Sequence, residues 1–271
     1  MKNTFLNYGF DYDHPYLSTA DILGLEYPEI INRKEFNPFC TFRHEGITPD
    51  FPLVMPIQKK ENNDPLISFI GNITLTQNYA PIEPIIIEDT VKLDMGGKTI
   101  TGPAFPTAYD AEGNVTETDS YGLWVKEGGE IVIDGAGIIE AQPATYSMAV
   151  WANGGKVVIN DGTFKNGEGS DLIYASAGGQ VEIYGGEFFP SFIPAGTEGT
   201  AQPYCALNLK NDGKDGSKIT VYGGRFHNFN PADNKSETEA WRAANPNQFV
   251  AEGYESVEVD SNVWEVRAID E

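Results

Sequence analysis

Cysteine, histidine and basic residues are scarce in this sequence. Its 271 residues include two cysteines and three histidines, and 18 lysines and arginines face 40 aspartates and glutamates, which gives a formal net charge of −22. Because such a field repels phosphate backbones, we expect no nucleic-acid partner. The histidines, His14, His44 and His227, have no metal-ligand spacing and no Cys-x-x-Cys beside them, so we expect no metal and no other cofactor.

Long apolar runs are also missing. No window approaches 18 uninterrupted apolar residues, so we expect no membrane-spanning helix. The first residues, MKNTFLNYGFDYDHPYL, lack an apolar h-region and a small-residue cleavage site, so we expect no Sec signal peptide and synthesis in a cytoplasm. Cys40 and Cys205 lie 165 positions apart, and their sparseness favours two free thiols over a single bridge.

The chain is rich in glycine and contains a repeated sequence motif. The 29 glycines and 17 prolines indicate short strands joined by tight turns. VEIYGGEFF at 181–189 returns as ITVYGGRF at 219–226, and Gly-Gly pairs at 128–129, 154–155 and 178–179 recur after 26 and then 24 residues. An all-β repeat of this length predicts stacked units that bury their apolar faces against one another, as in a parallel β-helix.

Apolar residues fall into columns when the repeats are aligned on their Gly-Gly pairs. Residues two apart in a strand point to the same face, so three columns are expected to point inward. They are Ile133, Ile159, Ile183 and Val221; Ile131, Val157, Val181 and Ile219; and Ile138, Phe164, Phe188 and Phe226.

The stretch IIIEDTVKLDMGGKTITG (85–102) resembles the first coils of pectin-lyase-like right-handed β-helix proteins. The resemblance covers residues 66–230 and implies a solenoid, but the family includes lyases, hydrolases, adhesins and phage spikes. The coils and the ending FVAEGYESVEV…WEV also resemble β-helical fibre and capsid-attached proteins of gut Bacteroidetes bacteriophages. We therefore expect an all-β, right-handed parallel β-helix with an irregular N-terminal arm and a C-terminal β cap.

Both ends differ from the repeats. Residues 231–271 contain a candidate short helix (236–245) and a hairpin-like segment (245–267) that we expect to cap the solenoid. Residues 1–65 are rich in aromatic residues and proline and have no period, which fits either an N-terminal cap or an extended arm that orders against a partner. The expected attachment residues in this arm are Phe5, Tyr8, Phe10, Tyr12, Tyr16, Phe36, Phe39 and Phe42.

Catalytic carboxylates do not line up along the repeats. The outward column Asp134, Asn160, Tyr184 and Tyr222 holds one acid, and so does the column Val132, Val158, Glu182 and Thr220. A glycosidase needs two carboxyl groups flanking one bond, and Asp119, Glu140 and Asp171 are the residues from which such a pair could be assembled. The weight of the sequence favours a protein that is not an enzyme.

Aromatic residues on the outer face are the stronger lead. Tyr184 and Tyr222 alternate with inward residues and should face solvent, and Phe189 and His227 form a second candidate ladder. Exposed rings on a rigid wall suit stacking on a sugar or burial against a partner. The same ladders also stabilise sheets by stacking along a column, and the sequence leaves both roles open.

Two classes of function compete. The first is a non-enzymatic virion structural protein, a phage head fibre, spike or decoration protein, which residues 1–65 attach to capsid or tail proteins. It would be a homo-oligomer, dimer or trimer, with a host-surface glycan as a further candidate partner. The second is a pectin-lyase-like polysaccharide lyase or hydrolase, such as a phage depolymerase, and a bacterial surface adhesin is a third option.

Overall fold

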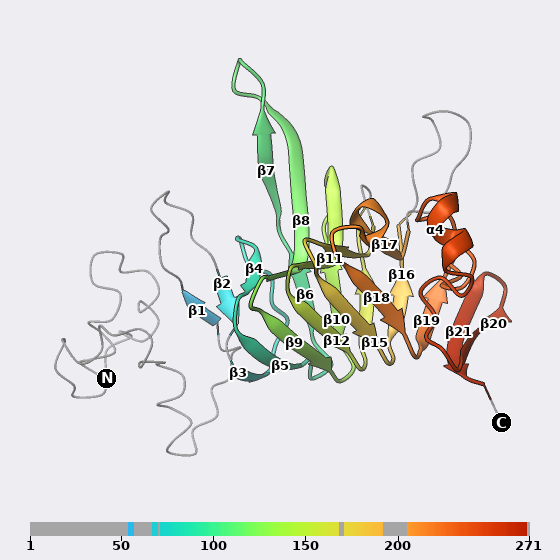
Figure 1. Cartoon of the computed structure of the whole chain (residues 1–271). Helices are drawn as coiled ribbons and strands as arrows, with labels where there is room; N and C mark the ends of the chain where they lie inside the picture. The colour runs from blue at the N-terminus through green and yellow to red at the C-terminus, as the bar shows by residue number, and fades with distance from the viewer. Residues whose placement is uncertain (1–53, 57–66, 70, 168–170, 192–204, 270–271) are drawn as a thin grey trace.

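The computed structural model describes residues 54–56, 67–69, 71–167, 171–191 and 205–269. Within them the chain consists almost entirely of strands and turns, with one α-helix, α4 (Glu239–Ala244), and a short 3₁₀ turn, η2 (Lys210–Gly213). The strands form three sheets in which most pairs are parallel (Figure 1). The expectation of an all-β chain with parallel sheets is confirmed.

The three sheets take strands from the chain in turn. The first comprises β1 (Val54–Pro56), β2 (Ile67–Phe69), β4 (Ile85–Ile87), β8 (Val115–Lys126), β11 (Tyr146–Asn153), β14 (Ile173–Ser176) and β17 (Leu207–Leu209), with β7 (Ala104–Tyr109) beside β8. The second comprises β3 (Gly71–Thr74), β5 (Thr90–Asp94), β9 (Glu130–Asp134), β12 (Lys156–Ile159), β15 (Gln180–Ile183) and β18 (Lys218–Val221). The third comprises β6 (Thr99–Gly102), β10 (Ile138–Ala141), β13 (Thr163–Lys165), β16 (Glu187–Phe189), β19 (Gly224–His227), β21 (Val263–Ala268) and β20 (Tyr254–Asp260).

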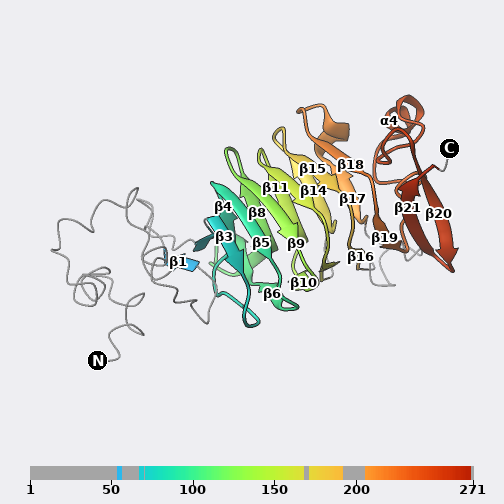
Figure 2. The same ribbon diagram turned by 90° about the horizontal axis from the view of Figure 1, so that it is seen from below.

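From β4 onward, each repeat contributes one strand to each sheet. Thus β8, β9 and β10 belong to one repeat and β11, β12 and β13 to the next, and every one pairs in parallel with its counterpart. Figure 2 shows these repeats side by side along the molecule, in chain order. Since neighbouring strands in a sheet lie about 4.8 Å apart, successive repeats stack at that spacing.

The inward columns form one continuous apolar core. Ile133, Ile159, Ile183 and Val221 are register partners in neighbouring strands, and all four are fully buried. The column of Ile131, Val157, Val181 and Ile219 has the same register and is also buried. Both columns are confirmed, and the register extends the first one to Leu93 in β5.

The third column is right except for its first member. Phe164, Phe188 and Phe226 are fully buried, and neighbouring rings stack with centroids 5.0 and 4.5 Å apart. The residue that pairs with Phe164 is Ile139, whereas Ile138 pairs with Thr163 and is only half-buried. The prediction of Ile138 was wrong because the buried positions Ile133 and Ile139 are one residue further apart in the chain than their partners Ile159 and Phe164.

The C-terminal end of the stack is covered by the chain itself. Strand β21 pairs antiparallel with β19 and with β20, which forms the hairpin expected within residues 245–267. Phe249 packs in the core cluster, and its carbonyl accepts a 2.8 Å hydrogen bond from the amide of Val221 in β18. Helix α4 lies within the expected segment, capped by the Thr238 hydroxyl, which accepts a hydrogen bond from the amide of Trp241.

A hairpin of β7 and the first half of β8 projects from the first sheet. Figure 1 shows it standing clear of the stacked repeats. Near its tip, Tyr109 and Val115 are register partners that are 61% and 48% exposed, respectively. Residues 104–119 carry four acids and no base, so this hairpin adds to the negative charge of the surface.

Candidate ligand-binding site

Along the outward column of the second sheet, polar residues are followed by tyrosines. Asn160 donates a 2.7 Å hydrogen bond to Asp134, and the next two positions are Tyr184 and Tyr222. The tyrosine rings stack with centroids 4.7 Å apart and planes 5° from parallel. Tyr184 remains 49% exposed, whereas Tyr222 is half-buried because Tyr254 packs edge-on against it. The expectation that both face solvent is therefore met fully by Tyr184 and in part by Tyr222.

Pairs of glycines follow the two tyrosines and form the floor of a hollow. A Cβ atom on Gly185 would lie 2.3 Å from the carbonyl oxygen of Asn160, and one on Gly223 would lie 2.2 Å from that of Tyr184. Gly186 and Gly224 have φ angles of 100° and 104°, a region that L-residues rarely adopt. Glycine is thus required at this corner by close backbone approach and by backbone conformation.

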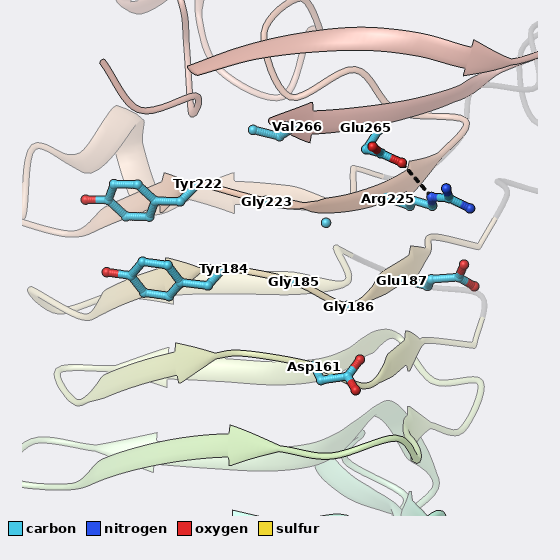
Figure 3. A pocket seen from close by; sticks show the side chains of 11 residues that line it. Asp161, Tyr184, Gly185, Gly186, Glu187, Tyr222, Gly223, Arg225, Glu265 and Val266 are labelled. Carbon is cyan, nitrogen blue, oxygen red and sulfur yellow. Dashed lines mark hydrogen bonds and ion pairs between the residues drawn. The ribbon is translucent and has the colours of Figure 1, made fainter. Parts of the chain in front are cut away.

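Charged side chains border the glycines on the side opposite the tyrosines. Figure 3 shows Glu187 and Arg225 there, on neighbouring strands, with Glu265 beside Arg225 and Asp161 on the repeat below. Arg225 Nε lies 2.7 Å from Glu265 Oε2, and this contact raises the pKa of the guanidinium. Tyrosines, glycines and charged residues together line an open hollow of about 410 Å³.

Phe189 and His227 stack as expected, with ring centroids 3.9 Å apart, but they do not line this hollow. Both are half-buried, and Lys165 Nζ lies 5.7 Å from the centre of the Phe189 ring. Of the four predicted contact residues, the structure brings Tyr184 and Tyr222 together in the hollow and places the other two along the third sheet.

Another aromatic cluster was missed by the sequence reasoning. Trp124 and Trp151 stack with ring centroids 4.9 Å apart and planes 5° from parallel, and Tyr121 packs against both. Phe105, on the projecting hairpin, packs edge-on against Tyr121. An alignment on the Gly-Gly pairs places Trp124 opposite Val150, because the turn after β11 is one residue shorter than the turn after β8.

The carboxylates considered for catalysis are each engaged locally. Asp119 accepts a hydrogen bond from the hydroxyl of Tyr121, and Glu140 accepts one of 2.8 Å from Thr101. Burial raises the pKa of Asp171 to about 6, against hydrogen bonds from Asn208 and Cys205 that lower it. Cys205 is a free thiol, and the described ranges contain no group of three or more histidine, cysteine or acidic residues able to hold a metal ion.

A second buried acid lies beside α4. Glu237 is 5% exposed and accepts a 2.7 Å hydrogen bond from the amide of Leu209. Burial raises its pKa to about 7, and the neighbouring carboxylates of Asp212 and Asp171 add to the rise. The fold therefore favours the protonated forms of Glu237 and Asp171.

The raised pKa values of Glu237 and Asp171 predict that the protein is more stable in mild acid. Their folded pKa values of about 7 and about 6 exceed the ordinary values of 4.5 and 3.8. Their contribution is complete below the ordinary values, declines as pH rises toward the folded values, and is absent above about pH 7. Thermal unfolding should therefore give a higher Tm at pH 5 than at pH 8, and the Glu237→Gln variant should show a smaller difference. An equal difference in both proteins would contradict the assignment to Glu237.

The remaining expected site residues lie outside the described residues. Phe5, Tyr8, Phe10, Tyr12, Tyr16, Phe36, Phe39 and Phe42 all belong to residues 1–53, as do His14, His44 and Cys40. In the part of the chain that is described, no helix has the length and apolar character needed to span a bilayer. Comparisons with protein-family models, with curated proteins and with solved structures found no match.

Proposed function

We propose that the chain is a right-handed parallel β-helix protein that serves as a non-enzymatic structural component of a phage particle. The β-helix is supported by the succession of strands through three sheets and by the columns shared between repeats. In this proposal residues 1–65 attach the protein to capsid or tail proteins as a head fibre, spike or decoration protein. The stacked repeats project from the particle and adhere to a host-surface glycan.

The observation that carries the proposal is the difference between the two ends of the stack. Strands β20 and β21 and the segment around Phe249 cover the last repeat, so β19, the last strand of the repeats in the third sheet, is not the edge of that sheet. The first repeat is instead preceded by the aromatic-rich residues 1–65. A stack that is covered at its C-terminal end and preceded in the sequence by an aromatic-rich segment suits a projecting particle component.

Deleting residues 1–60 tests this attachment. We expect the truncated chain to fold, because the core cluster of described residues runs from Phe69 to Val266. We also expect it to be absent from particles, since the segment that contacts the particle is gone. The measurement compares tagged full-length and truncated chains in particles purified by density gradient, with circular dichroism and thermal unfolding as a check on folding.

Equal incorporation of both chains would overturn the attachment role of residues 1–65.

The full-length protein is also expected to release no reducing ends and no unsaturated products from host capsule. Release of either product would favour the polysaccharide lyase or hydrolase over the structural protein, whatever the result with the truncated chain.

A further inference from the structure

The hollow beside Tyr184 and Tyr222 combines glycines that the corner requires with aromatic and charged side chains that it does not. Its floor is backbone at Gly185, Gly186, Gly223 and Gly224, one wall is aromatic, and the opposite wall is charged (Figure 3). The stack of the two rings accounts for their pairing but leaves half of the Tyr184 surface in solvent. We propose that this hollow binds a neutral sugar unit of a polysaccharide, an inference that rests on the adhesion part of the proposed function.

The chemistry of a pyranose matches the lining of the hollow. A sugar ring has apolar C–H groups on its faces and hydroxyl groups around its edge, so it suits a site with an aromatic wall and a few polar groups. Tyr184 and Tyr222 supply the wall, and the Tyr184 hydroxyl is held by a 3.0 Å hydrogen bond to Glu182. Carboxylates of Asp161 and Glu187 supply acceptors for sugar hydroxyls on the other walls.

Charge selects neutral sugars over uronates. Three carboxylates, Asp161, Glu187 and Glu265, and one guanidinium, Arg225, line the hollow, which leaves two negative charges. Arg225 Nε is paired with Glu265 Oε2 at 2.7 Å, so the one positive charge of the hollow is already balanced by a carboxylate of the same hollow. A uronate in the hollow would lie within a Debye length, about 8 Å at physiological salt, of these carboxylates and would be repelled.

Affinity electrophoresis of the full chain tests the inference. Gels contain dextran, β-mannan or β-galactan as neutral probes, and polymannuronate or polygalacturonate as anionic probes. We expect at least one neutral polymer to retard the protein and neither polyuronate to do so. Tyr184→Ala and Tyr222→Ala should each weaken binding about tenfold, because each removes half of the aromatic wall. Tyr184→Phe keeps the ring and should keep most of the binding.

Tyr146→Ala is the matched control. Tyr146 is 46% exposed, close to the value for Tyr184, but lies on β11 in the first sheet and away from the hollow. This variant should bind like the original protein, and thermal unfolding should show that all variants are folded. The inference is overturned if none of the neutral polymers retards the protein, if a polyuronate binds as well as the best neutral polymer, or if Tyr184→Ala binds like Tyr146→Ala.

These outcomes are separable from those for the proposed attachment. Particle incorporation depends on residues 1–65 and polymer binding depends on the hollow. Normal incorporation without polymer binding would overturn the sugar subsite alone. Polymer binding by a chain that incorporates without residues 1–60 would overturn the attachment alone.

Discussion

Replacing Phe188 by alanine is expected to lower the free energy of unfolding by about 3–5 kcal/mol. Phe188 is fully buried, and its ring stacks between those of Phe164 and Phe226, with centroids 5.0 and 4.5 Å away. Removing the ring leaves a cavity between two rigid neighbours, which strand pairing holds in place on both sides. Since domains are stable by about 5–15 kcal/mol in total, the loss would be a large share of the stability.

Phe189→Ala is the matched control for this substitution. Phe189 is adjacent in β16, points to the opposite face of the sheet and is half-buried, so its removal should cost about 1 kcal/mol. Urea-induced unfolding measured by tyrosine and tryptophan fluorescence gives both values. Equal losses for the two variants would mean that the third sheet does not bury Phe188 against its neighbours.

Gly223→Ala is expected to cost about 3 kcal/mol or more, because the added methyl group has no space. The new Cβ atom would lie 2.2 Å from the carbonyl oxygen of Tyr184, so the repeats would have to move apart. Overpacking of this kind costs about 1–3 kcal/mol when side chains can adjust, and here the obstacle is backbone. The measured quantities are the Tm and the yield of soluble protein.

Gly97→Ala separates crowding from backbone strain. Gly97 has a φ of 72°, but nothing lies within 4 Å of its missing Cβ atom, so only the strained conformation contributes, at about 1 kcal/mol. A Gly223→Ala variant that is as stable as Gly97→Ala would show that successive repeats do not approach as closely as this structure has them.

The inward columns could be predicted because alternation in a strand has a fixed period of two. Once VVIN, VEIY and ITVY were aligned, burial of Ile159, Ile183 and Val221 followed from the pleat alone. Turn length has no comparable rule. One additional residue between the register positions of β9 and β10 was enough to move the buried position from Ile138 to Ile139.

The candidate site was predicted in part for the same reason. The stack of Tyr184 on Tyr222 lies within a stretch where two repeats match without a gap, so the column could be read directly. Trp124 and Trp151 precede turns that differ in length by one residue. An alignment on the Gly-Gly pairs in those turns therefore did not place the two tryptophans opposite each other. The charged wall was missed because Glu265 enters from β21, outside the repeats, to pair with Arg225. Alignment on the alternation within each strand would have revealed the tryptophan stack but not Glu265.

A crystal structure of the full chain tests the central claim most directly, namely that successive repeats stack into one parallel β body around a shared apolar interior. The account predicts that the Cα atoms of Ile133, Ile159, Ile183 and Val221 follow one another in a row about 4.8 Å apart, with their side chains shielded from water. Four side chains scattered over the molecule, or lying in solvent, would contradict it.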